Sequence, residues 1–464
     1  MSYPIEQSTF DAESDKSVRL DLDRQAHIQK GTIEPEQVRS GASPMRACMV
    51  AYTFYESDNR VRRYAETLVQ HGYRVDAIAL RREKQSDQPT VVSGVRVFHI
   101  QCRVKNETSR LAYLGKLLLF FLRSMVLLTW EQIKDPYDLI HVHSVPDFEV
   151  FAALYPKLAG SKVVLDIHDI VPEFYASKFG VSPESVVFRL LVAVERLSAA
   201  FSDHVIAANH IWHQRLRDRS VQDCKLTAIL NFPDTQMFRR RGRNRSDNKF
   251  IVLYPGSLNY HQGVDIAVRA FAIVKDQAPE AEFHIYGSGE QFEYLKSLIM
   301  ELKLQDRVFL RGSLPIDQMV SVMENADMGV VPKRKNSFGN EAFSTKILEF
   351  MVMGVPVILP DTDIDTYYFN DSVAKFFRAD DEQSLGAAMA QLMKDSNLRE
   401  DLVRNASEFV KQYSWNANQA VYLDLVDSLV NSENGRAKRT NASGSQDRRS
   451  PNGPDAVNRE NKNY

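Results

Sequence analysis

The chain has 464 residues, of which 44% are apolar, and a formal net charge of −2 at pH 7. This length and composition predict a globular protein of two or three domains, and the near-neutral charge argues against a general nucleic-acid binder. The three cysteines, Cys48, Cys102 and Cys224, are widely spaced and form no CxxC pair, which predicts a reducing compartment and no structural zinc site.

Both ends of the chain are predicted to be disordered. Residues 1–44 form a polar arm that lacks the apolar core of a signal peptide, so we expect a cytoplasmic location rather than secretion. Residues 434–464 are polar and rich in Asn, Arg and Gly, and we expect a disordered tail there. Neither end is expected to carry chemistry.

Between these ends, apolar strands alternate with amphipathic helices, a pattern typical of parallel sheets covered by helices on both faces. Residues 45–232 are predicted to form a first doubly wound domain. Its strands are expected at 47–52, 73–80, 137–144, 162–169 and 204–209. Its helices are expected at about 60–71, 148–158 and 182–201, the last with Ser182 as the N-cap and Pro183 as its first residue.

An apolar segment from Leu111 to Trp130 is long enough to span a membrane. However, Lys116 and Arg123 lie near its middle, where a charge costs about 2.5–3.5 kcal/mol on insertion scales, so we do not expect a span. Apolar residues also occur on more than one helical face. The segment therefore either packs between other elements or rests one face on a membrane surface.

The arginine-rich stretch 239–248 has no apolar periodicity, so we place a linker at 233–248, either a solvated hinge or a contact for acidic lipid or phosphate. A second doubly wound domain is predicted at 249–408, followed by a helix at 409–433 that packs back on the first domain. Its strands are expected at 249–256, 282–289, 307–313, 328–333 and 355–360, and its helices at about 264–276, 291–302, 316–325 and 346–353. Ligands of such sheets bind beyond the carboxyl ends of the strands. The residues expected there are Gly256, Gly287, Gly289, Gly312 and Lys333.

The segment NEAFSTKILEFMVMGVPVILP places Glu341 and Glu349 eight residues apart on either side of a helix start. Ser344 and Thr345 are good N-caps, and the free N–H groups of a first helical turn bind phosphate. With carboxylates available for hydroxyl groups, this pattern predicts a nucleotide-sugar site. Alternatively, the dipole alone favours the glutamates and GVPVILP is an ordinary buried strand. A glycosidase pair is disfavoured, because eight helical residues rise about 12 Å and such pairs lie about 5–9.5 Å apart.

Four further segments accompany this spacing: LNFPDTQMF (230–238), YPGSLNYHQGVDIAVRAF (254–271), HIYGSGE (284–290) and DRVFLRGSL (306–314). The ordered set resembles the retaining GT-B glycosyltransferases of family 4 over about residues 46–430. The resemblance implies an α/β fold in which two Rossmann-like doubly wound domains face a central cleft. It also implies that the second domain holds most of the nucleotide-activated sugar.

The resemblance implies a role for each matching residue. Glu341 would bind the hydroxyls of the donor sugar and Glu349 those of the ribose, while the N–H groups of Ser344, Thr345 and Lys346 would bind the diphosphate. The strand from Val308 to Gly312 would lie by the base. His143 would lie near the donor sugar, and His168 with Asp169 would face the acceptor, although each histidine could simply be a strand-end side chain bonded to backbone.

Two departures from the family pattern affect these roles. Ser257 and Gln262 stand where the family has an arginine and a lysine that balance the diphosphate, so another cation must stabilise the leaving group. We favour Lys346 and Lys333, with His261 as a weaker contributor. The first domain also lacks a Gly-rich loop after its first strand, so we expect Asp58 and Arg60 to shape the acceptor side, unless Asp58 only caps a helix.

These observations predict a retaining enzyme that moves a hexosyl group from a nucleoside diphosphate sugar to a lipid-linked saccharide in cell-surface polysaccharide biosynthesis. We expect no cofactor and no metal, because no DxD motif lies at a strand end. We also expect a peripheral location at the inner face of the membrane and no nucleic-acid partner. A GT-B-type nucleotide-sugar epimerase and a non-catalytic sugar-nucleotide-binding partner stay open as alternatives.

Overall fold

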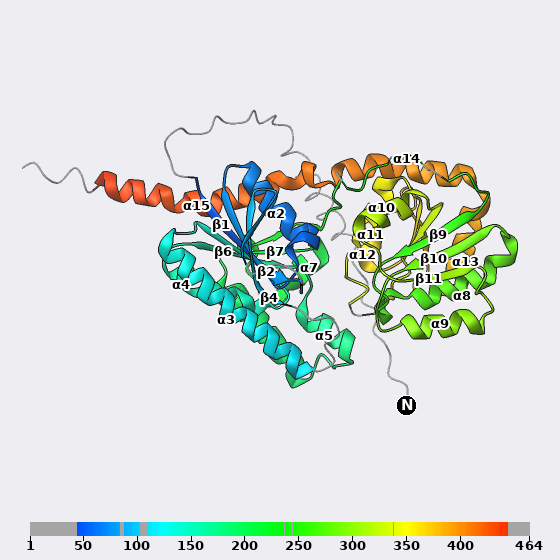
Figure 1. The fold of residues 1–464 in the computed structure, drawn as a ribbon, viewed down its shortest axis with the longest axis horizontal. Helices are drawn as coiled ribbons and strands as arrows, with labels where there is room; N and C mark the ends of the chain where they lie inside the picture. Colours follow the sequence, from blue (N-terminus) through cyan, green and yellow to red (C-terminus); the bar gives the residue numbers. More distant parts are fainter. Residues whose placement is uncertain are drawn as a thin grey trace, which may run out of the picture. The chain divides into compact units, whose positions relative to one another are not determined.

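A computed structural model of the chain describes residues 44–83, 88–102, 110–235, 237–240, 242, 245–336 and 338–443. The predictions for residues 1–43 and 444–464 lie outside these residues. The described chain forms two α/β units, each built on its own sheet with helices on both faces (Figure 1). The predicted α/β class with doubly wound sheets is confirmed.

The first sheet has the strand order β3-β4-β2-β1-β5-β6-β7-β8. Every pairing is parallel except that between β3 and β4, a hairpin that the sequence analysis missed. From β1 the chain adds β2 on one side and β5 on the other, so the order of the strands reverses at β1. The carboxyl ends of β1 and β5 therefore flank the crevice in which such sheets bind ligands. The strands are β1 (Arg46–Ala51), β2 (Arg74–Arg81), β3 (Thr90–Val92), β4 (Val95–Cys102), β5 (Leu139–His143), β6 (Lys162–Ile167), β7 (His204–Ala207) and β8 (Leu226–Ala228).

Helices cover both faces of this sheet because its central strands are apolar on both sides. In β1, Ala47 and Met49 belong to one buried cluster, whereas Cys48 and Val50 belong to another on the opposite face. The helices are α2 (Asn59–Gln70), α3 (Arg110–Lys134), the 3-10 helix η2 (Asp147–Ala153), α4 (Leu154–Leu158), α5 (Val171–Phe179), α6 (Val186–Phe201) and α7 (His210–Arg219). Figure 1 shows α2 and α3 on opposite sides of the sheet.

Two helix predictions in this unit need correction. The segment expected as one helix at 148–158 is mostly the 3-10 helix η2, with only the short α4 after it. The N-cap of α6 is Ser185 rather than Ser182, because the Ser185 hydroxyl accepts a hydrogen bond from the Phe188 N–H at 3.2 Å. Ser182 and Pro183 instead form a turn before the helix.

The second sheet has the order β11-β10-β9-β12-β13-β14, and all of its pairings are parallel. The order in which the strands are added reverses between β9 and β12, so the candidate crevice lies at the carboxyl ends of these two strands. The strands are β9 (Phe250–Pro255), β10 (Ala281–Tyr286), β11 (Val308–Arg311), β12 (Met328–Val330), β13 (Val357–Pro360) and β14 (Lys375–Phe377). The helices are α8 (Val264–Val274), α9 (Phe292–Glu301), α10 (Ile316–Glu324), α11 (Thr345–Met353), α12 (Asp363–Tyr368), α13 (Glu382–Lys394) and α14 (Ser396–Gln412).

The last helix of the described residues, α15 (Trp415–Ser443), packs on the first unit although it follows the second in sequence. Residues 434–443 belong to this helix, so the prediction of a disordered tail is wrong over these residues. The Tyr422 side chain is fully buried, and its hydroxyl lies 3.0 Å from Nδ1 of His141 on β5. The indole N–H of Trp415 donates to the Thr67 hydroxyl of α2 at 2.8 Å. These contacts tie α15 to α2 and β5 of the first unit.

Helix α3 has a buried face and an exposed face. Leu117, Phe120 and Leu128 pack into the first unit, whereas Leu118 and Leu122 are 46% and 50% exposed. Judged by length and composition alone, one helix of the described residues is long and apolar enough to cross a membrane, and it is α3 over residues 112–134. Since one face contacts solvent, the alternative that the segment packs between other elements is wrong, and the alternative that this face rests on a membrane surface stays a prediction.

Candidate active site

A cavity of about 140 Å³ lies at the start of α11, beyond the carboxyl ends of β9 and β12. Ser344 is the N-cap residue of this helix, but its hydroxyl makes no capping bond and is buried with no hydrogen-bond partner among the described residues. The N–H groups of a first helical turn also lack intrahelical acceptors. These groups suit an anion. Six residues predicted from the sequence line this cavity: His261, Gln262, Lys333, Ser344, Thr345 and Lys346.

Lys346 brings a positive charge to this cavity. Its ammonium donates to Oε1 of Gln262 at 3.1 Å, and the same oxygen accepts from the Tyr254 hydroxyl at 3.1 Å. Burial lowers the pKa of Lys346 to about 8, so this side chain is protonated in most molecules at pH 7. Gly256 makes room for it, because a Cβ there would lie 2.5 Å from Cε of Lys346. Gln262, which stands where the resemblance leads us to expect a lysine, therefore orients the ammonium of Lys346.

Lys333 lies at the same cavity but is already paired. Its ammonium is 3.0 Å from Oδ2 of Asp365 and donates to the Ala342 carbonyl at 2.8 Å, and its side chain is only 5% exposed. The prediction that Lys333 balances the charge of a diphosphate therefore needs correction. In the structure Lys333 supports the segment that leads into α11.

The two glutamates of the motif have different surroundings. Burial raises the pKa of Glu349 to about 7, although the charge of Lys346 opposes the shift. Glu341 is buried and forms an ion pair with Arg215 of α7, whose Nε lies 3.0 Å from Oε2 and whose Nη2 contacts Oε1. Burial raises the pKa of Glu341, and Arg215 opposes this shift. The sequence analysis did not identify Arg215, since it lies far from Glu341 along the chain.

Glycine turns allow β9 and β10 to approach each other at their carboxyl ends. A Cβ at Gly287 would lie 1.8 Å from the Gly256 carbonyl oxygen, so no other residue fits there. Beside this turn, the carbonyl of Ser257 accepts from the Tyr254 hydroxyl at 2.7 Å. The Cα of Gly312 faces open space beyond β11.

The prediction for Val308 needs correction. It is buried in the core at the start of β11, not at the ligand end. Arg311 occupies that end, with its guanidinium over the rings of Tyr286 and Phe309.

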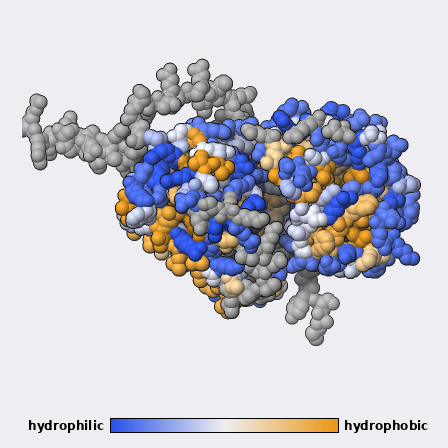
Figure 2. All heavy atoms as spheres, viewed as in Figure 1, coloured by the Kyte–Doolittle hydropathy of each residue, from blue (hydrophilic) through white to orange (hydrophobic). Residues whose placement is uncertain are grey.

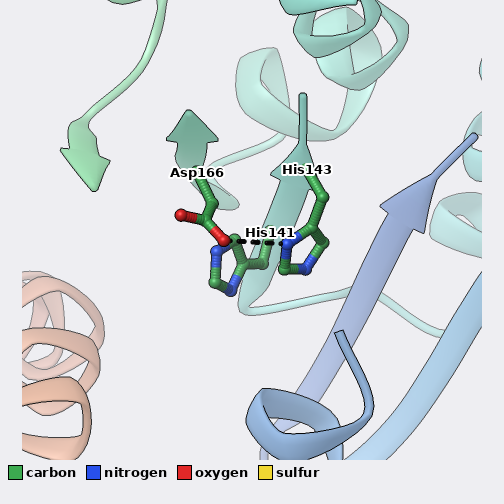
Figure 3. A group of neighbouring side chains, drawn as sticks. All are labelled: His141, His143 and Asp166. Atoms are coloured by element: carbon green, nitrogen blue, oxygen red, sulfur yellow. Dashed lines mark hydrogen bonds and ion pairs between the residues drawn. The ribbon is translucent and has the colours of Figure 1, made fainter. Parts of the chain in front are cut away.

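His143 and His168 meet around one buried carboxylate in the first unit. Nδ1 of His143 lies 3.1 Å from Oδ2 of Asp166 (Figure 3). Nε2 of His168 lies 2.8 Å from the same oxygen. Arg60 donates to both oxygens of Asp166 at 2.8 and 2.7 Å. Burial opposes ionisation of Asp166, but Arg60 and His168 outweigh it and hold its pKa well below the usual range. Sequence reasoning missed Asp166 of β6, which lies two residues before His168 in the chain.

This arrangement fixes how His143 can act. Because Asp166 is ionised, Nδ1 of His143 carries the proton, and burial lowers the pKa of the ring, which keeps it neutral at pH 7. Nε2 is then an acceptor, and it is buried with no hydrogen-bond partner among the described residues. His143 can therefore accept a hydrogen bond from a ligand hydroxyl.

His141, His143 and Asp166 offer ligand atoms that lie within 4.8 Å of one another (Figure 3). However, both oxygens of Asp166 already accept from Arg60, and Nδ1 of His141 already contacts Tyr422. A guanidinium beside the carboxylate also repels a divalent cation. The donor set therefore fits a charge-paired network better than a metal site.

The three residues predicted for the acceptor side do not act alike. Asp58 caps α2, accepting from the N–H groups of Arg60 and Val61 at 3.1 Å each. Arg60 is only 3% exposed and also donates to the Ile229 carbonyl. It therefore holds Asp166 in place and does not face a saccharide acceptor as predicted. Asp169 is half-buried at the end of β6, where burial raises its pKa.

A larger cavity of about 640 Å³ lies near the opposite, amino-terminal ends of β12 and β13. Asp327, Pro356 and Arg399 line it, and none of the predicted site residues does. Its lining mixes both charges, so we place the active site at the smaller cavity.

Comparison with known families assigns both units. The model described as "Glycosyl transferases group 1" matches residues 236–409, and that described as "Glycosyl transferase 4-like domain" matches residues 57–231. The matched ranges cover most of the two α/β units.

Two relatives illustrate the similarity in sequence. The chain is 31% identical over 153 residues to poly(glycerol-phosphate) alpha-glucosyltransferase of Bacillus subtilis, which is 32% of this chain but only 21% of that enzyme. It is 22% identical over 369 residues to the gpi3 subunit of phosphatidylinositol N-acetylglucosaminyltransferase of Schizosaccharomyces pombe, covering 77% of this chain and 74% of that subunit.

Solved structures show the same fold. A sucrose-phosphate synthase from Thermosynechococcus elongatus aligns with a TM-score of 0.67 at 18% identity, over 86% of this chain and all of that one. HepE from Anabaena, in complex with UDP and glucose, aligns with a TM-score of 0.62 at 16% identity, over 82% of this chain and 99% of that one. At these identities the likeness supports the GT-B fold of two Rossmann-like units and no more.

Proposed function

Because the chain belongs to the group 1 glycosyltransferases of family 4, and is thus a transferase, we propose that it moves a hexosyl group from a nucleoside diphosphate sugar to a saccharide acceptor with retention at the anomeric carbon. The observation that carries the proposal is the cavity at the start of α11. It combines unsatisfied helical N–H groups, the orphan hydroxyl of Ser344 and the protonated ammonium of Lys346. A diphosphate supplies the negative charge that such a cavity stabilises.

The remaining polar groups fit the rest of the donor. Glu349 lies one turn along α11 from Lys346, where its carboxyl group can bind the ribose hydroxyls. Glu341 and Nε2 of His143 are acceptors for hydroxyls of the donor sugar. The complex of HepE with UDP and glucose supports a nucleoside diphosphate and a sugar as the ligand class.

The proposed reaction follows a same-face route, because Glu341 is paired with Arg215 and is not placed as a free nucleophile. The bond between the anomeric carbon and the phosphate oxygen breaks, and the acceptor oxygen bonds to that carbon from the same side. The acceptor proton passes to the departing phosphate. Lys346 and the first turn of α11 stabilise the charge that develops on this leaving group.

We propose a lipid-linked saccharide as the acceptor, in cell-surface polysaccharide biosynthesis, and a location at the inner face of the cytoplasmic membrane. Two observations support this part. The S. pombe relative is named for transfer to phosphatidylinositol, a lipid acceptor. In addition, α3 exposes an apolar face beside the first unit. A nucleotide-sugar epimerase would share the donor site without needing any acceptor.

Ligand binding and product analysis test the proposal together. Thermal shift and calorimetry with UDP-, GDP- and ADP-sugars should give one donor that stabilises the native protein. The same assays with Lys346→Ala and Glu349→Ala should show at least about tenfold weaker binding, whereas Lys335→Ala, an exposed control, should bind normally.

Three outcomes would oppose the proposal. No heat with any activated sugar would exclude the donor site. Donor isomerisation without an acceptor would indicate an epimerase. Binding without turnover on any saccharide would indicate a non-catalytic partner, an alternative that the absence of arginine and lysine at positions 257 and 262 keeps open. The anomeric configuration of the product, read by NMR, decides retention.

A further inference from the structure

Apolar side chains of α3 form a regular exposed row. Leu114, Leu118, Leu122, Val126 and Trp130 follow one another at intervals of four residues, and each is between 46% and 67% exposed. Successive side chains four apart are neighbours on a helix, so the row winds gradually along the exposed side of α3. The opposite face packs into the first unit, so the row is a surface feature and not a part of the core.

A second row of the same kind lies on α6, more than 50 residues later in the chain. Val186, Leu190 and Leu197 are 80%, 62% and 62% exposed. The short α4 adds Leu158, which is 79% exposed. Isolated exposed apolar residues are ordinary, but rows on neighbouring helices mark interaction surfaces.

The helices that carry these rows are neighbours. Helix α3 packs against α4 and η2, and η2 in turn packs against α6. Aromatic pairs mark both junctions: Phe121 of α3 with Phe148 of η2, and Phe151 of η2 with Phe201 of α6. We call the exposed side of α3, α4 and α6 the docking face. Hydrophobic residues border the α3 region in Figure 2.

The docking face carries a surplus of positive charge. In the described parts of these helices, the only acidic residues are Glu131 and Glu195, and both are buried. The exposed or half-buried charged side chains of these helices are cationic: Lys116, Arg123, Lys134, Lys157, Arg189 and Arg196. Lys157 is paired with Asp203 at 2.7 Å, and the exposed Glu184 lies just before α6, so the other cations make up the positive surplus. A second copy of this chain on the same face would bring like charges together. An anionic lipid surface would instead complement both the cations and the apolar rows.

Helix α3 is held against the first sheet and cannot leave it to span a bilayer without unfolding this unit. Near its C-terminal end, Glu131 accepts from buried Arg46 and from Arg96, each at 2.8 Å. At its middle, Arg123 donates to the Ile100 carbonyl at 3.0 Å. The helix is therefore fixed with its apolar row facing outward.

We propose that α3, α4 and α6 together form a docking surface for an anionic lipid bilayer, in which α6 provides a second insertion row beside α3. The inference rests on the proposed function for its purpose, because a lipid-linked acceptor is presented at such a surface. It extends that function by naming α6 and the lipid charge as determinants of membrane binding.

Vesicle co-sedimentation of the full chain tests this surface without any turnover. Vesicles of phosphatidylcholine with roughly one third phosphatidylglycerol should bind the protein, because each cation near an anionic surface contributes about 1 kcal/mol, and pure phosphatidylcholine should bind it much less. The variant V186S/L190S/L197S on α6 should lower partitioning at least about tenfold, and L118S/L122S/V126S on α3 should do the same. The control I273S/M300S replaces exposed apolar residues of the second unit and should leave partitioning unchanged.

The outcomes separate this inference from the proposed function. Far-UV circular dichroism and donor calorimetry should be unchanged in both variants, which shows that they fold and keep the donor site. Unaltered partitioning of the folded α6 variant would overturn the inference even if transfer to a soluble acceptor is normal. A dimer in light scattering that these substitutions dissociate would also overturn it, since the face would then bind a second copy.

Discussion

Arg215 of α7 and Glu341, which precedes α11, form an ion pair between the two α/β units, with Nε and Oε2 3.0 Å apart. The side-chain amide of Asn209 donates to the Glu341 carbonyl at 3.1 Å and adds a second contact. A donor sugar that binds Glu341 must therefore share this carboxylate with Arg215. This pairing makes Arg215 a positioning residue for the proposed donor site.

We expect Arg215→Gln to make transfer more dependent on pH. Burial already raises the pKa of Glu341, and Arg215 is the cation that opposes the rise. Without it the pKa rises further, so the carboxylate ionises only at higher pH. We expect kcat/KM to fall about tenfold at pH 6 and to recover partly at pH 8. Arg217→Gln, on the same helix but paired with Asp218, should keep the wild-type pH profile, and a parallel profile for both variants would contradict the assignment.

Donor affinity should fall at alkaline pH because of Lys346. Its pKa is lowered to about 8 by burial, so the ammonium is present below pH 8 and is lost above it. We expect calorimetric affinity to be level between pH 6 and pH 7.5 and then to fall by up to about tenfold per pH unit. Lys346→Arg keeps its charge at these pH values and should remove this dependence. The same alkaline fall in Lys346→Arg would show that another group titrates.

Glu349→Gln should separate stability from binding. The pKa of Glu349 is raised from 4.5 to about 7, so the folded state resists ionisation. The contribution of Glu349 to the free energy of unfolding is fully present below the pKa of the unfolded state and is lost as pH rises through about 7. The melting temperature of the variant relative to wild type should therefore be higher at pH 8 than at pH 5. Its thermal shift with the donor should decrease at both values, and a difference independent of pH would contradict the burial argument.

Chelation should leave activity intact. The positive charge at the proposed leaving group comes from Lys346 and the α11 N-terminus, and the His141, His143 and Asp166 cluster is occupied by its own partners. We expect rates after dialysis against EDTA to stay within about twofold of the untreated enzyme. Loss of activity that Mg²⁺ or Mn²⁺ restores would show that the diphosphate is neutralised by a metal instead.

Tyr422 should be a strong point of attachment for α15. Its side chain is fully buried between Tyr64 and His141, so Tyr422→Ala should lower the free energy of unfolding by about 3–5 kcal/mol. Tyr422→Phe removes only the hydroxyl that contacts His141 and should cost about 1 kcal/mol. Urea denaturation followed by tryptophan fluorescence measures both changes. Equal effects of the two substitutions would argue against packing as the main contribution.

The sequence predicted the elements whose signal is local. Buried parallel strands such as β1 and β9 are continuous apolar runs, and the start of α11 follows a recognisable N-cap residue. The hairpin β3–β4 was missed, because its short edge strand exposes Val91 and carries little apolar pattern. The 3-10 helix η2 was predicted as α-helix, since both show similar spacing.

The candidate site was predictable where residues adjoin in sequence, as Ser344, Thr345 and Lys346 do. The pairings that changed the assignments join distant residues. Asp365 neutralises Lys333 from α12, and Arg60 of α2 binds Asp166 of β6. The sequence does not indicate which acidic and basic side chains will form an ion pair when they lie far apart in the chain. The burial of such side chains, and hence their role, therefore emerges only from the fold.

The return of α15 to the first unit has a consequence for biosynthesis. The pocket that receives Tyr422 and Trp415 is built from Tyr64 and Thr67 of α2 and His141 of β5, which are synthesised long before those aromatic side chains. Until then the nascent amino-terminal half displays Tyr64 and its apolar neighbours to the solvent. We therefore expect this half to complete its packing only after the whole second unit has been synthesised, and we expect chaperones to bind during that interval.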